Sequence, residues 1–238
     1  MRFAFSQAGE LDDEQPVRPL RPGIVAGHQL GPKGSIGLIV REINSQALLI
    51  LSCSHVLARS GFGAQGDVID QPTLVDDTSL QVASLTDSFS RLRTDGGNEG
   101  DFAIAAITDG IEAHAEIEGI GQPANVVLLN ARSFDAFKGV SVQRLGAATG
   151  LQSGIVAGYT GPCFLSGLPV FGPTLVRYDN VVEYRTNCAP GDSGAAVVVP
   201  STGQVLGLHV GGDPARQVGY FNPLGDVMGA FGIELVFD

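Results

Sequence analysis

Apolar residues recur along this chain in short β-rich runs, and clusters of Gly, Pro, Asp and Asn separate the runs. Runs of this length bounded by turn residues are typical of strands. One segment near the C-terminus, "PLGDVMGAFGI", has a helical pattern that its glycines weaken. We therefore expect an all-β fold with a short C-terminal helix. The clearest strand candidates are "SIGLIVRE", "ALLILSCSHVL", "LQVASLTDSF", "DFAIAAI", "TLVRYDNVVEYRT", "SGAAVVV", "GQVLGLHVGG" and "QVGYFNP".

Two segments interrupt this pattern and suggest how the chain is divided. Residues 6–23 are polar and acidic and then proline-rich, which is typical of an exposed arm. Residues 109–139 mix acidic, Gly and Pro positions, as expected of a connection between two halves. We predict an N-terminal arm over 1–23, a first unit over 24–121 and a second unit over 122–238.

Charge and cysteine content exclude several classes of partner. The net charge is -11 and the basic residues are scattered singly, so we expect no nucleic-acid partner and no anionic membrane surface. No apolar run is long enough to span a bilayer, and the first residues lack the apolar core of a secretory signal. The three cysteines are too few for a disulfide framework and lack zinc-site spacing. We expect a soluble, cytoplasmic protein that needs no metal and no cofactor. The alternative is a mature form that is exported by another route.

The stretch "APGDSGAAVV" brackets Ser193 with Gly191 and Gly194. A serine hydroxyl is a poor nucleophile at neutral pH, so it needs an imidazole base and a third group that orients this base. His55 follows a strongly apolar run, and Asp101 opens another. We expect the N–H groups of Gly191 and Ser193 to converge on one point, as in an oxyanion hole. We predict His55, Asp101 and Ser193 as catalytic residues.

The segments "SCSHVLA", "GDFAIAAI" and "APGDSGAAVV" occur in the order His, Asp, Ser and resemble chymotrypsin- and trypsin-like serine proteases. The resemblance implies two antiparallel six-stranded β-barrels, with the active site in the cleft between them. His55 and Asp101 would come from the first barrel and Ser193 from the second. The segments "RPGIVAGH", "GSIGLIVRE", "GDVIDQP" and "GAATGLQSGIVAGY" are more similar to bacterial trypsin-like peptidases related to the plant narrow-leaf protein.

This chain departs from the family pattern beside the catalytic histidine. Cys53 and Ser54 stand where family members often carry Ala or Asn, and the three cysteines cannot form the disulfides of the secreted enzymes. Neither departure removes a reacting group. Both argue against an extracellular digestive role.

In "GQVLGLHVGG", strict alternation puts His209 on a glycine face and the leucines on the opposite, core face. The segment resembles a strand of glutamyl endopeptidases and of viral picornain-type proteases, whose histidine contacts a Glu or Gln side chain preceding the cleaved bond. Cys188 stands where those families often have Thr or Ser, and Asn187 beside it is a candidate for the missing donor. The alternative is that His209 only hydrogen-bonds within the barrel. The predicted substrate-binding residues are His209, Asn187, Cys188, Gly211 and Gly212.

These observations favour a serine endopeptidase that acts on a protein or peptide substrate through an acyl-enzyme. One alternative is a protease-fold binding module that cleaves little. A cysteine hydrolase that uses Cys188 or Cys163 is less favoured, because neither is bracketed by glycines. The stretch 24–27 resembles the freed N-terminus of activated trypsin-like enzymes, which pairs with the residue matching Asp192. No basic residue precedes it, so we favour control by an activating partner or by a homo-oligomer.

Overall fold

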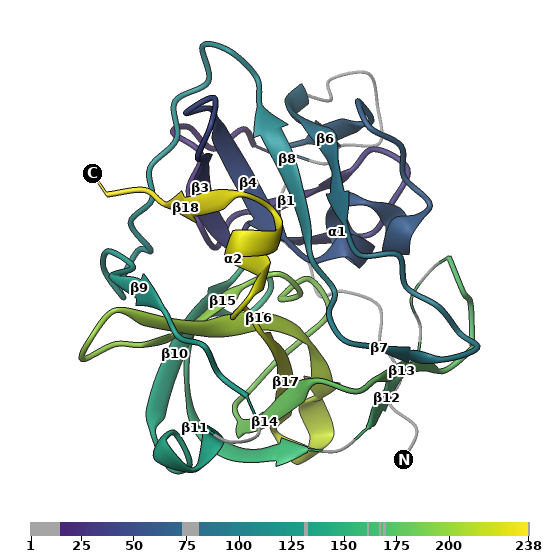
Figure 1. Cartoon of the computed structure of the whole chain (residues 1–238), viewed down its shortest axis with the longest axis vertical. Helices are drawn as coiled ribbons and strands as arrows, with labels where there is room; N and C mark the ends of the chain where they lie inside the picture. The colour runs from purple at the N-terminus through teal and green to yellow at the C-terminus, as the bar shows by residue number, and fades with distance from the viewer. Residues whose placement is uncertain are drawn as a thin grey trace.

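Two curled β-sheets, one above the other, form the body of the molecule in the computed structural model (Figure 1). The structure describes residues 15–72, 81–130, 133–160, 162–166, 168 and 170–237. The upper sheet is built mainly from the first half of the chain and the lower one from the second half. Within these ranges, no helix is long and apolar enough to cross a membrane.

The first sheet has the strand order β18-β3-β4-β8-β6-β5-β1-β2 and its two ends do not pair. Strand β4 lies between β3 and β8, and its apolar sequence LLILS is buried from its second residue onward. The strands are β1 (Val25–His28), β2 (Lys33–Ser35), β3 (Leu38–Glu42), β4 (Leu48–Ser52), β5 (Val68–Asp70), β6 (Gln81–Phe89), β8 (Ala103–Ile107) and β18 (Ile233–Leu235).

The second sheet closes into a barrel because β15 pairs with both β10 and β16. Its order is β15-β10-β11-β14-β17-β16-β9, and β9 is attached outside the closed ring, parallel to β16. The six ring strands are antiparallel to their neighbours. The strands are β9 (Asn125–Val126), β10 (Ser141–Gly146), β11 (Gly150–Thr160), β14 (Val181–Arg185), β15 (Ala196–Val199), β16 (Gln204–Asp213) and β17 (Val218–Pro223).

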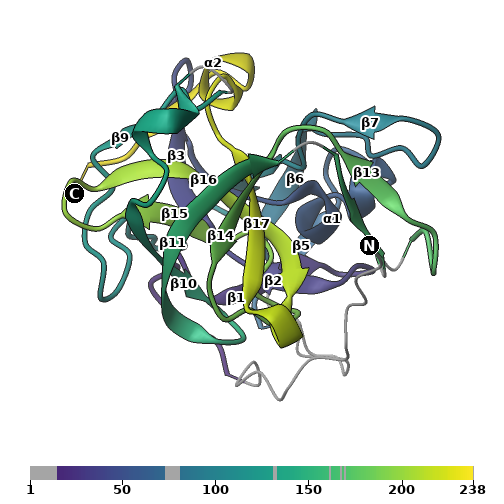
Figure 2. The ribbon, with the colours of Figure 1, turned by 90° about the horizontal axis from the view of Figure 1, so that it is seen from below.

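A small third sheet joins the two halves. It consists of β12 (Cys163–Leu165), β13 (Val176–Tyr178) and β7 (Gly97–Asn98), and β7 comes from the first half of the chain. Strands β7 and β13 lie side by side, apart from the two large sheets (Figure 2). The described helices are short: α1 (Ser54–Leu57), α2 (Val227–Ala230) and 3-10 turns at Arg59–Gly61, Phe134–Ala136 and Pro214–Arg216.

The hydrophobic core is continuous across the two halves. One cluster combines residues of the first sheet, such as Ile50 and Leu85, with Leu208 and Val210 of the second barrel. A second cluster, which includes Phe221, fills the rest of the closed barrel. Because the larger cluster includes both halves, the surface between them is packed as a core rather than as a separable contact.

The predicted all-β class, the two-barrel architecture and the C-terminal helix are confirmed. The strand counts differ from the expected six and six, because only the second sheet closes into a six-stranded ring. Strand β18 pairs with β3, so the end of the predicted second unit, 122–238, belongs to the first sheet. This exchange covers the edge of β3, which would otherwise leave unpaired backbone groups.

Two further expectations need correction. Residues 1–14 of the predicted arm lie outside the described residues, but Leu20 of the same arm is fully buried, and its N–H donates to Glu112 O at 2.8 Å. The strict alternation expected along β16 is interrupted by register shifts on both of its edges. In addition, both faces of the middle of this strand are buried, including the face that carries His209.

Candidate active site

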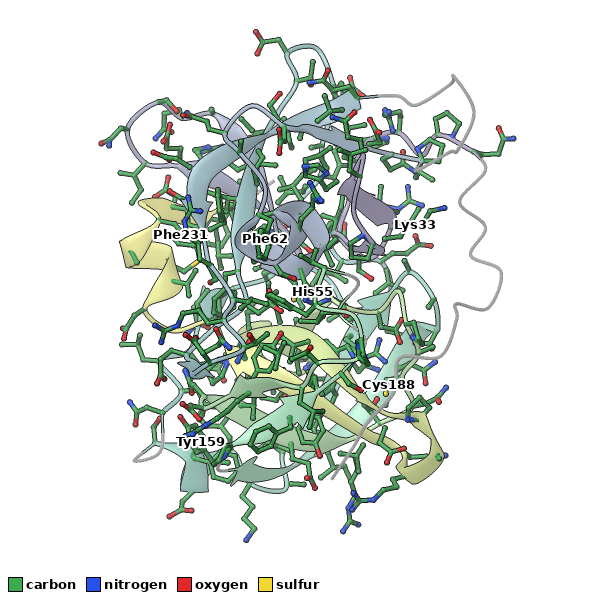
Figure 3. All side chains as sticks on the ribbon, turned by 90° about the vertical axis from the view of Figure 1, so that its right-hand side faces the viewer. Lys33, His55, Phe62, Tyr159, Cys188 and Phe231 are labelled. Carbon is green, nitrogen blue, oxygen red and sulfur yellow. The ribbon has the colours of Figure 1, made fainter. Side chains whose placement is uncertain are left out.

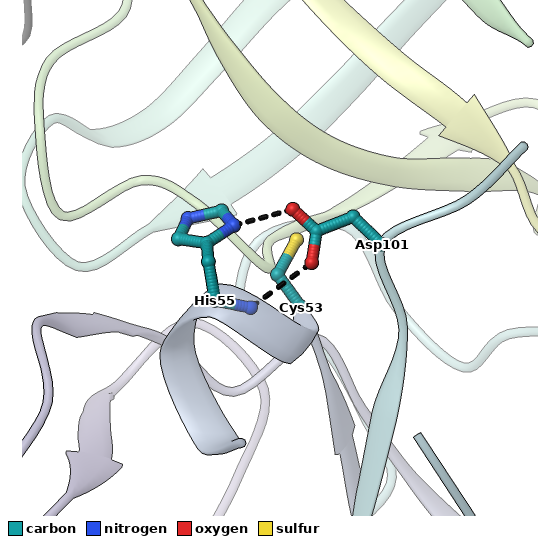
Figure 4. A group of neighbouring side chains, drawn as sticks. All are labelled: Cys53, His55 and Asp101. Carbon is teal, nitrogen blue, oxygen red and sulfur yellow. Dashed lines mark hydrogen bonds and ion pairs between the residues drawn. The ribbon is translucent and has the colours of Figure 1, made fainter. Parts of the chain in front are cut away.

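His55 lies in the first turn of α1, at the boundary between the two halves (Figure 3). Its ring Nδ1 is 2.5 Å from Asp101 Oδ2, and its backbone N–H donates to Asp101 Oδ1 at 3.0 Å (Figure 4). The first N–H groups of a helix have no partner within the helix. Asp101 therefore caps the start of α1 and holds the imidazole ring with the same carboxylate.

Asp101 is fully buried, and a buried carboxylate needs hydrogen bonds to remain charged. Burial by itself raises the pKa of Asp101, but the charge of His55, the hydrogen bonds from His55 and the Tyr178 hydroxyl hold this pKa below its ordinary value. The Tyr178 hydroxyl donates to Asp101 Oδ2 at 2.9 Å. An ionised Asp101 fixes the tautomer of His55, because it accepts the proton on Nδ1 and leaves Nε2 as the basic nitrogen.

Ser193 lies in a tight loop between Gly191 and Gly194, and its side chain is almost fully buried. Gly194 has a φ of +96°, and a Cβ on it would overlap Ser52 Oγ and Ser35 O. No residue with a side chain fits there, which explains the second glycine of the motif. The loop is attached to the first sheet by the N–H of Ser35, which donates to Ser193 O at 2.7 Å.

Two observations bring Ser193 close to the His55 segment. The carbonyl of His209 accepts both the N–H of Gly194, at 2.8 Å, and the thiol of Cys53, at 3.4 Å. In addition, a Cβ on Gly34 would overlap Val56 and lie 2.7 Å from Ser193 O. Among the described residues, the Ser193 hydroxyl donates only to Val210 O, at 3.5 Å, and no hydrogen bond joins it to His55.

The N–H groups of Gly191 and Ser193 have no acceptor within the described part of the chain. Gly191 has a φ of +102°, a conformation that favours glycine. Its carbonyl accepts the Ser35 hydroxyl at 2.8 Å, so this carbonyl points toward the first sheet. An oxyanion hole requires N–H groups that are free of other acceptors, and this pair meets that requirement.

Asp192, between these two residues, is fully buried and paired with Arg144. The guanidinium donates to Asp192 Oδ2 at 2.9 Å, and Thr149 donates to the same carboxylate through its N–H and its hydroxyl. Arg144 thus occupies the place beside Asp192 that the sequence suggested for a freed N-terminus. Arg144 also donates to Asn187 O at 2.6 Å and to Thr149 Oγ1 at 3.4 Å.

His209 is buried beside the loop that carries Ser193, and its Nδ1 is 2.8 Å from the Tyr184 hydroxyl. Burial lowers the pKa of His209 well below its ordinary value, and the charges of Arg144 and His55 lower it further. His209 is therefore neutral. The Arg144 guanidinium, which can only donate, also bonds to the Tyr184 hydroxyl oxygen. The Tyr184 hydroxyl therefore donates its own proton to His209 Nδ1, and the proton of the neutral His209 lies on Nε2.

A narrow pocket next to His209 contains most of the predicted substrate-binding residues. Its cavity volume is about 10 Å³, which is room for about one water molecule. A Cβ on Gly212 would lie 2.6 Å from Cys188 Sγ, so the walls are already in contact. The lining residues are Cys188, Ala189, Pro190, His209, Gly211, Gly212 and Pro214.

Asn187 is the one predicted pocket residue that the structure places elsewhere. It is exposed, whereas Thr186 and Cys188 on either side are buried, because successive side chains of an extended segment point to opposite sides. Asn187 lines a separate depression with Gln152, Glu183 and Arg216. Its carbonyl, not its side chain, contributes here, by accepting the hydrogen bond from Arg144.

All three cysteines are free and buried. Burial raises the pKa of Cys188 to about 11 and that of Cys163 to about 12. Only a thiolate is a good nucleophile, so neither thiol is activated. The side chains of Cys53, His55 and Asp101 have their ligand atoms within 4.8 Å of one another, but His55 Nδ1 and Asp101 Oδ2 are already hydrogen-bonded to each other at 2.5 Å (Figure 4). We therefore assign no metal to this cluster.

Sequence reasoning did not identify Arg144, Tyr184 or Tyr178. A signal for Arg144 was present, because Val142, Arg144 and Gly146 alternate with outward residues and are buried. An arginine on an inward face needs an acidic partner. The tyrosines gave no such signal, since their partners are distant in the sequence.

Comparison with known proteins supports the same fold and the same family resemblance. No family model matches the chain. Streptogrisin-A from Streptomyces griseus is 33% identical over 105 residues, which cover 43% of this chain and 32% of that protein. The chain therefore matches only about a third of the length of this curated relative.

Solved structures match over nearly the whole chain. The Nocardiopsis protease NAPase has a TM-score of 0.64 at 15% identity, covering 92% of this chain and 99% of its own. A glutamic acid specific serine protease also reaches 0.64, at 17% identity and with 91% and 100% covered. Thermobifida fusca Protease A reaches 0.62, at 18% identity and with 92% and 99% covered. At these identities the matches establish the two-barrel fold. With the streptogrisin-A match, they confirm that the chain resembles the chymotrypsin- and trypsin-like serine proteases.

Proposed function

We propose that this protein is a serine endopeptidase that uses Ser193 as nucleophile, His55 as general base and Asp101 as the group that orients His55. The observation that carries the proposal is the buried His55–Asp101 pair, joined at 2.5 Å, on a segment whose neighbours lie close to the glycine-bracketed Ser193 loop. An ionised aspartate on Nδ1 leaves Nε2 free to accept the serine proton. The relation to narrow-leaf-type peptidases stays a prediction.

In the acylation step, Ser193 Oγ attacks the carbonyl carbon of the substrate while its proton passes to His55 Nε2. The N–H groups of Gly191 and Ser193 stabilise the negative oxygen. His55 then gives the proton to the leaving amine, the C–N bond breaks, and an ester remains on Ser193. A water molecule, activated by the same imidazole, hydrolyses the ester and restores the enzyme.

One adjustment must precede the attack. The Ser193 hydroxyl now donates to Val210 O at 3.5 Å, a weak bond at the limit of hydrogen-bonding distance. The attack requires that this bond be exchanged for one to His55. Such contacts commonly become shorter only when substrate is bound.

A fluorophosphonate probe tests the nucleophile directly, because it reacts only with an activated serine. We expect labelling of the wild-type protein, loss of labelling in Ser193→Ala, and unchanged labelling in Ser45→Ala, whose serine lies in an exposed turn. Turnover of peptides should fall in Ser193→Ala by several orders of magnitude. Peptide cleavage that survives at more than a few per cent in purified Ser193→Ala would contradict the assignment.

We further propose cleavage after Glu or Gln. The support is the neutral His209, whose Nε2–H is a donor for a side-chain oxygen of the substrate. One structural neighbour is described as a glutamic acid specific serine protease that binds substrate with a histidine triad. Here the partner of His209 is Tyr184.

A neutral donor favours an uncharged amide, since a carboxylate in the pocket would lack a counter-charge. Within this pair of substrates we therefore expect Gln to be preferred.

His209→Ala tests the specificity separately from the chemistry. An unpaired polar group in a buried pocket costs about 1–3 kcal/mol, or roughly 5- to 150-fold in kcat/KM. We expect this loss for Gln and Glu peptides and a much smaller one for Ala peptides, measured by mass spectrometry of peptide-library products. Equal losses on all peptides would assign His209 a purely structural role and leave the protease assignment intact.

A second candidate function is a protease-fold binding module that cleaves little. It is favoured by the cavity of about 10 Å³ next to His209, which is too small for a Glu or Gln side chain. If the protein is an endopeptidase, the two sides of this pocket, residues 188–190 and 211–214, must move apart to admit the substrate side chain. Binding of an activating partner or self-association would provide this movement. The probe decides between the two, because a binding module leaves Ser193 unlabelled.

We propose a cytoplasmic location, supported by the three free cysteines. Thiols are kept reduced in the cytosol and tend to pair in oxidising compartments. Quantitative thiol labelling of the protein isolated from its source cells checks this. Modification of the three cysteines before denaturation should be slow, because all three are buried.

A further inference from the structure

Tyr178 makes a contact to the candidate catalytic group that its position in the sequence does not suggest. Its hydroxyl donates to Asp101 Oδ2 at 2.9 Å across 77 residues of sequence, and both side chains are fully buried. The same oxygen of Asp101 bonds to His55 Nδ1. Together with the N–H of His55, the carboxylate accepts three hydrogen bonds.

The small third sheet holds Tyr178 in this place. Strand β13 pairs in parallel with β7, and the register puts Tyr178 opposite Asn98. The side-chain amide of Asn98 donates to Arg177 O at 2.8 Å and to Arg93 O at 3.0 Å, while its oxygen accepts the N–H of Arg93. Asn98 is itself buried and lies only three residues before Asp101. The loop that carries Asp101 is therefore joined directly to the strand that carries Tyr178.

We propose that Tyr178 is a positioning residue of the reaction: its hydroxyl holds the Asp101 carboxylate in the orientation that serves His55, and the β7–β13 pairing delivers it. This proposal rests on the proposed function. Tyr178 touches neither substrate nor a bond that changes, so it acts entirely through Asp101. Tyr178 is therefore a second residue, besides Ser193, through which the second half of the chain contributes to the site.

The direction of the expected effect follows from charge. The groups that face Asp101 are His55 on α1, Cys53 just before it and Tyr178 on β13, with Cys163 near the same hydroxyl. The neutral Tyr178 donor stabilises the carboxylate whether or not His55 is protonated. Without it, the remaining stabilisation comes from His55, so the His55–Asp101 pair holds an added proton more tightly. A protonated pair is not a base, and activity is then lost at a higher pH.

The test compares Tyr178→Phe with Tyr159→Phe. Both remove a hydroxyl that bonds to a side-chain oxygen, but the Tyr159 hydroxyl donates to Asn180 Oδ1 at 2.5 Å and, among the described residues, makes no hydrogen bond to Asp101. A hydrogen bond to a charged group is strong, so we expect kcat/KM at neutral pH to fall by about 10-fold in Tyr178→Phe, and the acid side of its pH profile to move up by roughly half a unit to one unit. Tyr159→Phe should leave the profile in place.

A readout that needs no protease activity separates this proposal from the proposed function. In the Ser193→Ala background, the proton shared by His55 Nδ1 and Asp101 should give a far-downfield NMR signal. Tyr178→Phe should shift this signal and raise the pH at which it changes, even if the protein proves to be a binding module. If Ser193 is not labelled by the probe but the signal shifts, the protease assignment fails and the positioning role stands.

Asn98→Ala supplies a second variant, because it loosens β13 without changing the tyrosine. We expect the acid side of the profile to move in the same direction as in Tyr178→Phe. The proposal is overturned if Tyr178→Phe lowers the rate equally at every pH and leaves the NMR signal in place. It is also overturned if Tyr159→Phe reproduces the shift. If Tyr178→Phe does not fold, an unmoved profile in folded Asn98→Ala overturns it as well.

Discussion

At the scale of single residues, the chemistry depends on how a few buried polar groups are paired. Asp101 accepts three hydrogen bonds with no exposure to solvent, and His209 is kept neutral between Tyr184 and the protein interior. Each of these groups would be costly without its partners. Substitutions that keep the shape and change the hydrogen bonding are therefore the most informative ones.

Asp101→Asn keeps the size of the side chain but replaces an acceptor oxygen by an amide that donates. The amide favours the wrong tautomer of His55, and the N–H of α1 loses its charged partner. We expect kcat to fall on the order of 10⁴-fold at neutral pH, with partial recovery at high pH. The measurement is the pH profile of kcat, with Asp95→Asn, an exposed acid of the preceding loop, as control. A profile like that of the wild type would assign the orienting role to another acid.

His209 also makes stability depend on pH. Its pKa is well below the ordinary value in the folded state, because burial and the charges of Arg144 and His55 oppose protonation. The unfolded chain binds this proton at about pH 6.5, so the free energy of unfolding falls as the pH drops below that value, by up to about 1.4 kcal/mol per pH unit. We expect His209→Gln to lose less stability in urea titrations between pH 6.5 and 5 than wild type. His114→Gln, an exposed histidine, should behave like wild type.

At the scale of elements, strand β10 supports the loop that carries the nucleophile. Arg144 on its inward face binds Asp192 and the carbonyl of Asn187, so it joins the loop to the barrel at two points. Arg144→Met removes one charge of a buried pair and leaves Asp192 uncompensated. We expect a loss of about 3–5 kcal/mol in the free energy of unfolding. Urea unfolding measures it, and the double variant with Asp192→Asn should recover most of the loss. No recovery would mean that Arg144 acts by packing alone.

At the scale of the whole molecule, the two halves meet where backbone approaches backbone. Gly194 has no room for a Cβ against Ser35 and Ser52 of the first sheet. Gly139 has a similar φ of +82° but nothing within 4 Å of a Cβ.

Left-handed backbone costs roughly 1–2 kcal/mol for a residue with a side chain. Gly139→Ala should lose about that much, and Gly194→Ala clearly more, since it must also separate the halves. Thermal unfolding compares the two. Equal losses would mean that the two halves can move apart at Gly194 without a further loss of stability.

Much of this architecture follows from local patterns. Short β-rich runs with turn residues between them predict an all-β protein, and the pattern around Val227–Ala230 predicts the C-terminal helix. The motifs around His55, Asp101 and Ser193 identify candidate reacting groups because a serine nucleophile requires a base and an acid. The inward position of Arg144 can be read from its two-residue period in β10. Each of these inferences uses residues that are neighbours in the sequence.

By itself, then, the sequence determined the fold class, the candidate catalytic residues and their order along the chain. Only the tertiary structure decided which distant groups complete them: Tyr178 on Asp101, Arg144 on Asp192, and Tyr184 on His209. It also decided that β18 returns to the first sheet and that Asn187 points away from the pocket. The physical reason is that periodicity tells which face of a strand is buried, whereas the partner of a buried polar group depends on how sheets far apart in the sequence pack together.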